Sequence, residues 1–328
     1  MILVTGGTGF LGAHLLTHLL QAGEEVRCIY RSKPFKYLPQ NIVEKIEWVR
    51  GDVLDVVLLE NALQGIDRVY HCAGKVSYDP ADKQDLYKVN VEGTANVINC
   101  CINKKIKKIV NVSSVAAIGR SKPNTPIDET AAWEEHANDT AYAKSKYLAE
   151  MEVWRGEAEG LSTVIVNPSL IIGPSLFWAE GAPKLIKNIA DGFSFYTTGI
   201  TGFTDARDVA RLMIILMDAP VSGERFIINT ENWSYKKLFL TIRDQLGMNT
   251  RFKQAGILMS AIVWRVVWLK SLLTGSKRLI TKETARKASQ KVFFSNKKIS
   301  DFLPSFHWIP LKKTIADTCK AYLNQQEP

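Results

Sequence analysis

The first twelve residues constrain the fold of this chain more than any other segment. Met1–Thr5 is an apolar run of strand length, and Gly6-Gly7-Thr8-Gly9-Phe10-Leu11-Gly12 follows it directly, where a helical pattern begins. Gly6, Gly9 and Gly12 suit three demands: a tight turn, close approach of a ligand to the backbone, and close packing of the helix on the strand. A strand, a glycine-rich turn and a helix in this order predict that the helix N-terminus binds the pyrophosphate of a dinucleotide.

Short apolar segments alternate with helix-length segments over the first half of the chain. We expect strands at Met1–Thr5, Glu25–Tyr30, Ile46–Arg50, Arg68–Cys72, Lys108–Val112 and Ser162–Asn167, with helices over 10–22, 55–64, 83–103 and 140–159 between them. Because these strands are apolar throughout, both faces of their sheet should be covered. The sequence therefore predicts an α/β fold with a doubly wound parallel sheet, the Rossmann fold.

The second half of the chain departs from this alternation. Prolines and glycines interrupt the segment after Asn167, and a helix over 206–217 and a strand over 225–228 would return to the central sheet. Past Ser234 the pattern is mostly helical. We therefore expect a dinucleotide-binding domain over 1–167 and about 203–230. A smaller, mostly helical substrate-binding lobe would take about 168–202 and 231–328.

Composition limits the cellular compartment and the kinds of partner that we expect for this chain. Five scattered cysteines without C-x-x-C spacing, and no apolar leader, favour a reducing cytoplasm over export. His14 and His18 stand one helical turn apart, but no third ligand accompanies them, so we expect no metal. The segment 277–298 holds eight basic residues against one acid and so supplies +7 of the net charge of +9. No recognition motif accompanies it, and we expect no nucleic-acid partner.

The segment before that basic stretch is almost wholly apolar. Ile257–Leu273 carries Trp264 and Trp268, but it is too short and too interrupted by charges to span a membrane. An apolar, tryptophan-bearing helix beside a basic cluster could lie on an anionic membrane surface. Peripheral membrane contact through 257–298 is therefore one interpretation. A buried lobe helix or the contact of a homodimer is the other.

The preference between the two dinucleotides depends on the end of the second predicted strand. A site that prefers NAD places a carboxylate there, which accepts hydrogen bonds from the ribose 2′-hydroxyl. This chain reads Val26-Arg27-Cys28-Ile29-Tyr30-Arg31-Ser32-Lys33 and has no acid in that position. Arg31 could bind a 2′-phosphate, or it could be a solvated loop residue. The sequence favours NADP, with NAD as the alternative.

Two further segments carry side chains suited to acid–base chemistry. Tyr142 and Lys146 are four residues apart in a predicted helix and therefore share one face. The ammonium should lower the pKa of the phenol, and such a tyrosine could exchange a proton with a substrate oxygen. Ser113-Ser114 follows the fifth predicted strand, at the edge where ligands of parallel sheets bind. A Ser–Ser turn and two exposed helix residues are the alternative interpretations.

These motifs together resemble one family. The chain carries, in order, Thr5–Gly12, Gly51-Asp52-Val53, His71-Cys72-Ala73-Gly74, Val89–Thr94, Ser113-Ser114, Tyr142-x-x-x-Lys146 and Gly202–Ala210. The set resembles the extended short-chain dehydrogenase/reductases, the NAD-dependent epimerase/dehydratase group. The resemblance is strong over residues 1–175 and faint beyond about 232.

The resemblance implies a role for each matching position. Tyr142 would be the general acid/base and Ser114 the donor to the substrate oxygen. Lys146 would tune Tyr142 and hold the nicotinamide ribose, and Asn90 would belong to the proton relay. The implied cofactor-binding residues are Gly6, Thr8, Gly9, Phe10, Leu11, Gly12, Arg31, Asp52, Val53, Ala73, Gly74, Tyr142, Lys146 and Pro168.

Departures from the family pattern narrow the reaction. Sugar-nucleotide dehydratases carry an acid pair where this chain has Val115 and Ala116, and epimerases usually carry Tyr where it has Ile172. The chain resembles more closely the dihydroflavonol-4-reductase and 3β-hydroxysteroid dehydrogenase-like branch. That branch implies an NADP(H)-dependent oxidoreductase interconverting a ketone and a secondary alcohol. An NAD-dependent nucleotide-sugar epimerase and a non-catalytic dinucleotide sensor are the alternatives.

The substrate is indicated only by class. Apolar and aromatic residues follow the cofactor site, among them Phe177 and Trp178, and they could line a cleft for a lipophilic or aromatic small molecule. Packing inside the lobe is their alternative role. Ser77 and Tyr78, shortly after the fourth predicted strand, are further candidates for substrate contact.

Overall fold

A seven-stranded sheet forms the centre of the computed structural model, which describes residues 1–33, 35–120, 125–136, 139–249, 251–255 and 289–325. Its strands are β1 (Ile2–Thr5), β2 (Val26–Tyr30), β3 (Glu47–Arg50), β4 (Arg68–His71), β5 (Lys108–Val112), β6 (Thr163–Pro168) and β10 (Glu224–Ile228). They run in the order β10-β6-β5-β4-β1-β2-β3, with every neighbouring pair parallel. The order reverses between β1 and β4, and ligands of such sheets bind at the carboxyl edge of this switch point.

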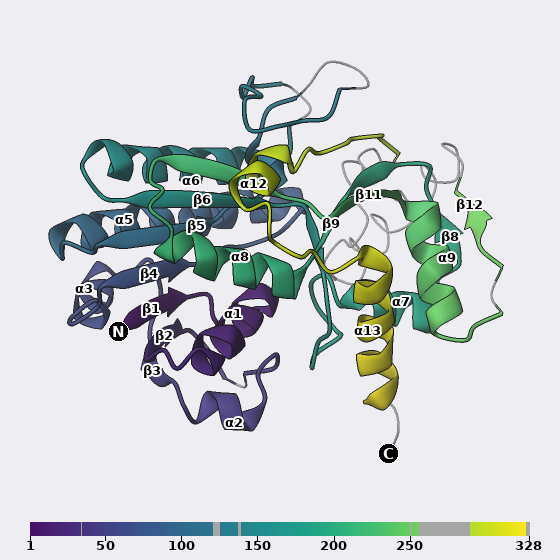
Figure 1. Ribbon diagram of the computed structural model, residues 1–328, viewed down its shortest axis with the longest axis horizontal. Helices are drawn as coiled ribbons and strands as arrows, with labels where there is room; N and C mark the ends of the chain where they lie inside the picture. Colours follow the sequence, from purple (N-terminus) through teal and green to yellow (C-terminus); the bar gives the residue numbers. More distant parts are fainter. Residues whose placement is uncertain (34, 121–124, 137–138, 250, 256–288, 326–328) are drawn as a thin grey trace.

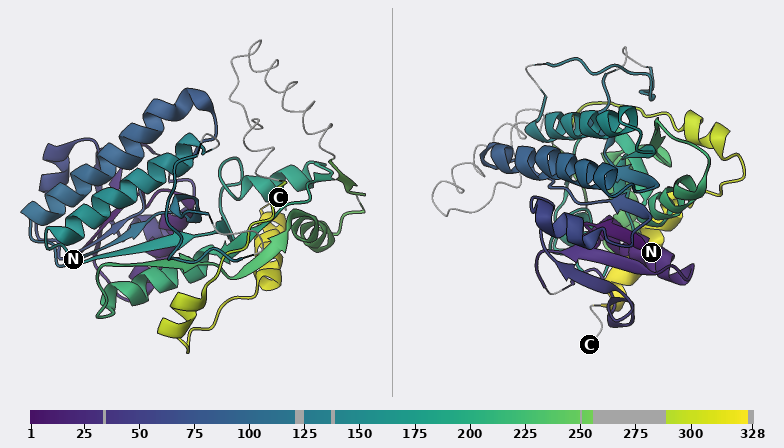
Figure 2. Two further views of the ribbon diagram at one scale, coloured as in Figure 1. Left: turned by 90° about the horizontal axis from the view of Figure 1, so that it is seen from above. Right: turned by 90° about the vertical axis from the view of Figure 1, so that its left-hand side faces the viewer.

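Alternate side chains of the strands enter two hydrophobic cores, one on each face of the sheet. Ile2 and Val4 pack with α1 (Phe10–Gln21) and α8 (Ala206–Asp218). Leu3 points the other way, toward α3 (Val56–Ala62), α5 (Gly93–Asn103) and α6 (Ala141–Ala158). Figure 2 shows the sheet between these two helical layers. Both faces are buried, so the predicted doubly wound fold is confirmed.

The expected elements of the first half are present with small shifts. All six expected strands occur, with ends at most one residue from those expected. The expected helix over 83–103 is divided into α4 (Lys83–Leu86), a π-helical turn over Tyr87–Glu92, and α5. Such turns insert an extra residue and are frequent at functional sites. This one carries the buried side chain of Asn90.

The C-terminal lobe contains small sheets as well as helices, which the helical pattern after Ser234 does not reveal. β7 (Leu170–Ile172), β9 (Ile200–Asp205) and β11 (Glu231–Ser234) form one sheet, and β8 (Phe195–Tyr196) and β12 (Lys253–Gln254) form another. Within the described residues the lobe helices are α7 (Lys184–Ala190), α9 (Tyr235–Gln245) and α13 (Leu311–Asn324). α12 (Lys297–Phe302) lies beside β10, and α2 (Gln40–Val43) lies near α1.

One buried carboxylate links the lobe to the central domain. Asp205 caps α8 by accepting a hydrogen bond from the backbone of Arg207 at 2.8 Å, and it also binds that residue's guanidinium. The hydroxyl of Thr314, on α13, donates to the same carboxylate at 2.7 Å. Because Asp205 is fully buried, these contacts fix α13 against the end of β9.

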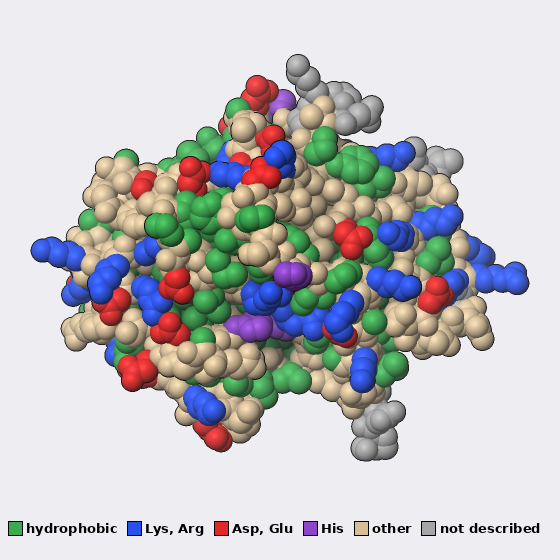
Figure 3. All heavy atoms as spheres, in the orientation of Figure 1, with side chains coloured by type: hydrophobic (Ala, Val, Ile, Leu, Met, Phe, Trp, Pro, Cys, Tyr) green, Lys and Arg blue, Asp and Glu red, His purple; other side chains and the backbone are tan. Residues whose placement is uncertain are grey.

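Four observations bear on membranes, partners and metals. No helix within the described ranges is long and apolar enough to cross a bilayer. The segment 257–298, interpreted as a membrane or dimer contact, lies mostly in residues 256–288, outside the described part. Acidic and basic side chains both occur across the face seen in Figure 3. Among described residues no group of three or more potential metal ligands gathers, and His14 binds the carbonyl of Pro174 at 3.0 Å.

Candidate active site

The glycine-rich loop between β1 and α1 has the shape that a pyrophosphate requires. Gly6 adopts φ +73°, and a Cβ there would lie 2.4 Å from the backbone nitrogen of Ala73. A Cβ on Gly12 would lie 2.3 Å from the Gly6 carbonyl oxygen. α1 begins at Phe10 with no side-chain cap and no acid in its first turn. Its first N–H groups therefore remain available to an anionic ligand, and a dinucleotide fits this loop.

A buried chain of hydrogen bonds forms the floor beside this loop. His71 contacts the Thr5 hydroxyl through Nδ1 at 2.6 Å and the Thr94 hydroxyl through Nε2 at 3.0 Å. Thr94 donates its own proton to the Asn90 carbonyl at 2.6 Å, so His71 Nε2 is the donor to Thr94. Burial lowers the pKa of His71 to about 3 and keeps the ring neutral. Sequence reasoning missed His71 and Thr94, although both belong to motifs that it quoted.

Asn90 joins the loop after β4 to α6. Its side-chain oxygen accepts from the backbone nitrogen of Lys75 at 2.7 Å, and its amide nitrogen donates to the Lys75 carbonyl and to the Ser145 hydroxyl. Ser145 in turn donates to the Tyr142 carbonyl at 2.8 Å. A Cβ on Gly74 would lie 3.4 Å from the Asn90 side-chain oxygen. The backbone at Gly74 therefore faces this network directly.

Ser114, Tyr142 and Lys146 converge at the carboxyl edge of the sheet. Tyr142 and Lys146 lie in the first two turns of α6, which Thr140 caps by accepting from the Ala143 backbone at 3.0 Å. Ser114 follows β5 and begins a short 3₁₀ turn, so its hydroxyl is held at the strand end. The Lys146 ammonium donates to the Val112 carbonyl at 2.8 Å and lies under Gly74.

The pKa values of this group differ from expectation. Burial raises the pKa of Tyr142, the nearby Tyr78 phenol raises it further, and a hydrogen bond with Ser114 opposes the rise. The pKa of Tyr142 is therefore raised, not lowered as predicted, because desolvation of the phenolate dominates. Burial also lowers the pKa of Lys146 to about 8, against the opposing charge of Glu150.

Aromatic side chains stand beside the Tyr142 phenol. The Tyr78 ring meets the Tyr142 ring edge-on at 5.7 Å between centroids. Tyr235, at the start of α9, is close enough to Tyr78 for that phenol to raise its pKa, after burial as the larger cause. Sequence reasoning missed Tyr235, because it comes from the lobe, 93 positions after Tyr142 in the chain. Ser77 donates to Asp82 at 2.7 Å and so belongs to its own loop.

Phe177 and Trp178 lie in different surroundings. The Phe177 ring meets the Tyr37 ring edge-on at 5.5 Å, and the Lys36 ammonium lies 4.5 Å from its centroid. Trp178 is only 6% exposed, packs in the lobe core against Tyr322 and donates to Gln325 at 2.5 Å. Trp178 therefore has the packing role that was its alternative.

The far end of the cofactor site contains an ion pair that the sequence did not reveal. Arg31, just after β2, lies 3.6 Å from the carboxylate of Asp52, which follows β3. Their side chains are 68% and 36% exposed, so solvent screens the pair and Arg31 stays accessible to a ligand. Val53 is buried against Gly93, and Pro168 ends β6. Thr8 and Leu11 belong to the glycine loop and the first turn of α1.

This fold and this edge of the sheet define a dinucleotide-dependent α/β enzyme. Residues 2–229 match the model of the NAD dependent epimerase/dehydratase family, and the chain belongs to that family. The predicted family and the prediction of an NAD(P)-dependent enzyme of the extended short-chain dehydrogenase/reductase type are thereby confirmed.

Named relatives agree with the predicted branch. The chain is 33% identical over 250 residues to "Putative dihydroflavonol 4-reductase" of Synechocystis, covering 75% of this chain and 72% of that one. It is 30% identical over 246 residues to "Sterol demethylase protein B" of Methylococcus capsulatus, covering 75% and 74%. The solved structure titled "Crystal structure of gox2253" superposes with a TM-score of 0.82 at 27% identity, covering 100% and 98%.

Proposed function

We propose that this protein is an NADP(H)-dependent oxidoreductase that interconverts a ketone and a secondary alcohol. The observation that carries the proposal is the convergence of Ser114, Tyr142 and Lys146 beside Gly74, at the switch point of the sheet. A hydroxyl, a phenol and an ammonium in one buried corner are what proton transfer to a carbonyl oxygen needs.

Each residue has a part in that chemistry. The Ser114 hydroxyl and the Tyr142 phenol would both hold the substrate oxygen, with Tyr142 giving its proton during reduction and taking it back during oxidation. The bound nicotinamide would supply or accept the hydride. Lys146, whose pKa of about 8 leaves it mostly charged at neutral pH, would stabilise the phenolate left behind. Asn90 would hold the start of α6 through Ser145.

The cofactor assignment rests on Arg31. Its exposed guanidinium stands at the end of β2, where a 2′-phosphate would lie, and its pairing with Asp52 through solvent is weak enough to exchange for a phosphate. NADP(H) is therefore the favoured cofactor, with NAD as the alternative. Asp52 would then border the adenine together with Val53.

The substrate class rests on the tyrosines around Tyr142. Tyr78 gives the site a flat aromatic surface beside Tyr142, which favours a lipophilic or aromatic ketone. Tyr235 packs on Phe203 and Phe239 in the lobe and supports Tyr78 from that side. One relative bears the name "Putative dihydroflavonol 4-reductase", which supports a substrate of this class. Phe177 would lie at the rim of this site. Trp178 is left out of it because it packs in the lobe core.

The remaining features complete the proposal. Residues 1–167 and about 203–230 would bind the dinucleotide, and about 168–202 and 231–328 would bind the substrate. Five free cysteines suit a reducing cytoplasm. A homodimer is the assembly to test. An epimerase of the same family is the second candidate function, although Ile172 stands where epimerases usually carry tyrosine.

The test is an assay of the purified protein with a panel of aromatic and steroid ketones. We expect at least one ketone to be reduced with oxidation of NADPH, followed by absorbance at constant pH, and NADH to be a poorer reductant. UDP-glucose with NAD tests the epimerase. Sugar epimerisation without any ketone reduction would overturn the proposal, and cofactor binding without either reaction would favour the dinucleotide sensor.

A further inference from the structure

A buried carboxylate on α6 has no part in the proposed chemistry as described so far. Glu150 lies one turn after Lys146 and two turns after Tyr142, so all three occupy one face of the helix. Its side chain is fully buried. A carboxylate in such a place costs several kcal/mol unless cations and hydrogen-bond donors surround it. Its contacts therefore indicate what it does there.

Glu150 is connected to Ser114 through one amide. The side-chain nitrogen of Asn167, near the end of β6, donates to a Glu150 carboxylate oxygen at 2.5 Å. The same nitrogen donates to the Ser114 carbonyl at 3.0 Å. Asn167 is itself fully buried, so no solvent competes for these bonds. The carboxylate thus orients the amide that fixes the backbone of Ser114.

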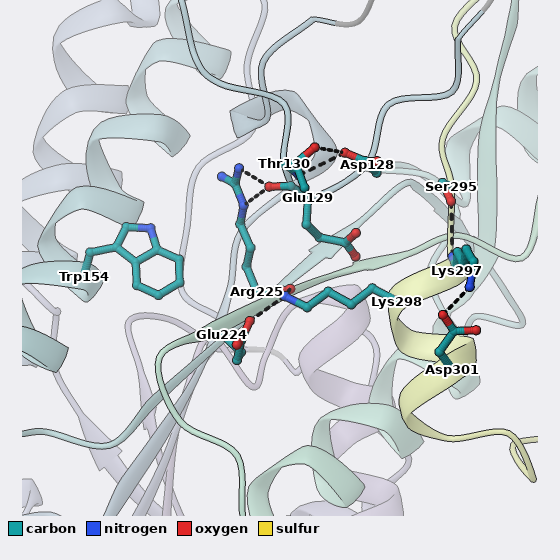
Figure 4. Close-up of a pocket in the computed structure, with 10 residues that line it drawn as sticks. All are labelled: Asp128, Glu129, Thr130, Trp154, Glu224, Arg225, Ser295, Lys297, Lys298 and Asp301. Carbon is teal, nitrogen blue, oxygen red and sulfur yellow. Dashed lines mark hydrogen bonds and ion pairs between the residues drawn. The ribbon is translucent and has the colours of Figure 1, made fainter.

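Cations face Glu150 from two elements. The Arg225 guanidinium, on β10, lies 3.4 Å from the second carboxylate oxygen. Lys146 lies one turn before Glu150 on α6, and its charge acts on the carboxylate without forming an ion pair with it. Arg225 also donates to the Glu129 carbonyl at 2.5 and 3.0 Å, at the wall of the surface groove drawn in Figure 4. Glu150 therefore connects the interior site to a rigid anchor on the edge strand.

The geometry points to Glu150 as a positioning residue that holds Ser114 in place through Asn167 and, one turn from Lys146 on the same helix face, favours the charged form of that ammonium for proton transfer. This inference rests on the proposed function, because it assigns Glu150 a part in that reaction. Glu150 touches neither substrate nor cofactor in this scheme. Because one carboxylate serves two catalytic groups, its function offsets the cost of burying the charge of Glu150.

The inference has a consequence for the titration of Lys146. Burial lowers the pKa of Lys146, and the charge of Glu150 raises it. Burial likewise raises the pKa of Glu150, while hydrogen bonds from Ser113 and Asn167 and the charges of Arg225 and Lys146 oppose that rise. Cys72 and His71, on the β4 side of Lys146, are kept neutral by burial at neutral pH. Removing the charge of Glu150 should therefore let Lys146 lose its proton at a lower pH.

The primary test follows the Lys146 amine directly and needs neither substrate nor cofactor. Wild-type protein, Glu150→Gln and the control Glu152→Gln are labelled with trace acetic anhydride between pH 6 and 10, and acetylation of Lys146 is measured by peptide mass spectrometry. Glu152 lies on the same helix and binds Arg155 at the surface. We expect the labelling midpoint to move to lower pH in Glu150→Gln alone. An unchanged midpoint would overturn the inference.

Measurement of turnover is the second part of the test. Glu150→Gln should lower kcat by about 10–100-fold, the effect of a small misplacement of catalytic groups, with KM nearly unchanged. Glu150→Asp keeps the charge, so it should keep the wild-type labelling midpoint while losing kcat, because its shorter side chain withdraws from Asn167. If Glu150→Gln does not fold, Glu150→Asp takes its place in the test. A wild-type kcat in Glu150→Asp would contradict the inference. Wild-type protein inactive on every ketone would refute the proposed function instead, while the labelling would still report on Glu150.

Discussion

Replacing Lys146 with methionine should stabilise the protein while damaging its chemistry. The Lys146 side chain is 8% exposed, and burial lowers its pKa from 10.5 to about 8. At about 1.4 kcal/mol per pH unit, that difference costs roughly 3 kcal/mol of folding free energy at pH 7. Methionine removes this cost but loses the hydrogen bond to the Val112 carbonyl, worth about 1 kcal/mol. The free energy of unfolding at pH 7 should therefore rise by roughly 2 kcal/mol.

The pH dependence of that gain identifies its cause. Between pH 8 and 10.5 the unfolded chain holds a proton on Lys146 that the folded protein does not, so wild-type stability rises with pH over this window. The advantage of Lys146→Met should therefore shrink toward pH 10, as measured by urea denaturation at pH 7 and 10. Lys144→Met, at an exposed position paired with Glu135, is the control and should change stability by less than about 0.5 kcal/mol. A Lys146→Met protein less stable than wild type at pH 7, or equally favoured at both pH values, would refute the reasoning.

Three further changes test other parts of the site. Arg31→Ala should reduce the preference for NADPH over NADH by about 1–3 kcal/mol, measured by calorimetry, and equal affinities in the wild-type protein would contradict the NADP assignment. Gly6→Ala should weaken dinucleotide binding and lower the melting temperature more than Gly65→Ala, which shares φ +73° but meets no atom within 4 Å; equal effects would count against the close approach of the loop to β4. Burial lowers the pKa of His14 to about 4, below its ordinary 6.5, so protonation of the unfolded chain costs stability as the pH falls below 6.5. Replacing His14 with Gln should reduce the loss of unfolding free energy between pH 7 and 5 by up to about 2 kcal/mol in urea titrations, and an unaltered loss would rule this out.

The central fold could be predicted because its determinants are local. Most strands of the sheet have an apolar centre and are followed by a turn or a helix of recognisable length, so the expected strand ends lie within one residue of the observed ones. The π-helical turn at Asn90 was missed, because an inserted residue leaves the apolar periodicity of a helix almost intact. The sheet of β8 and β12 was missed because both strands are two residues long. The sheet of β7, β9 and β11 was missed because its strands come from separate segments of the chain.

The site could be predicted only where it follows from motifs. A strand end and a helical spacing of four indicated Ser113-Ser114, Tyr142 and Lys146, and the family resemblance then selected Ser114 and gave each residue its role. Tyr235 and the Arg31–Asp52 pair depend on contacts between distant segments, which no local pattern records. The pKa of Tyr142 moved opposite to expectation, because burial, unlike spacing, cannot be seen in the sequence.

The most direct measurement compares the turnover and the NADPH affinity of Tyr142→Phe with those of the control variant Tyr147→Phe. Both tyrosines lie on α6, but Tyr147 stacks on Trp133 at 4.7 Å between centroids, whereas Tyr142 shares a hydrogen bond with Ser114. Tyr142→Phe should lose a factor of about 10²–10⁴ in kcat while binding NADPH almost as wild type does, since the glycine loop carries most of the affinity. Tyr147→Phe should keep its activity. A Tyr142→Phe enzyme that reduces its ketone at nearly the wild-type rate would show that another group supplies the proton.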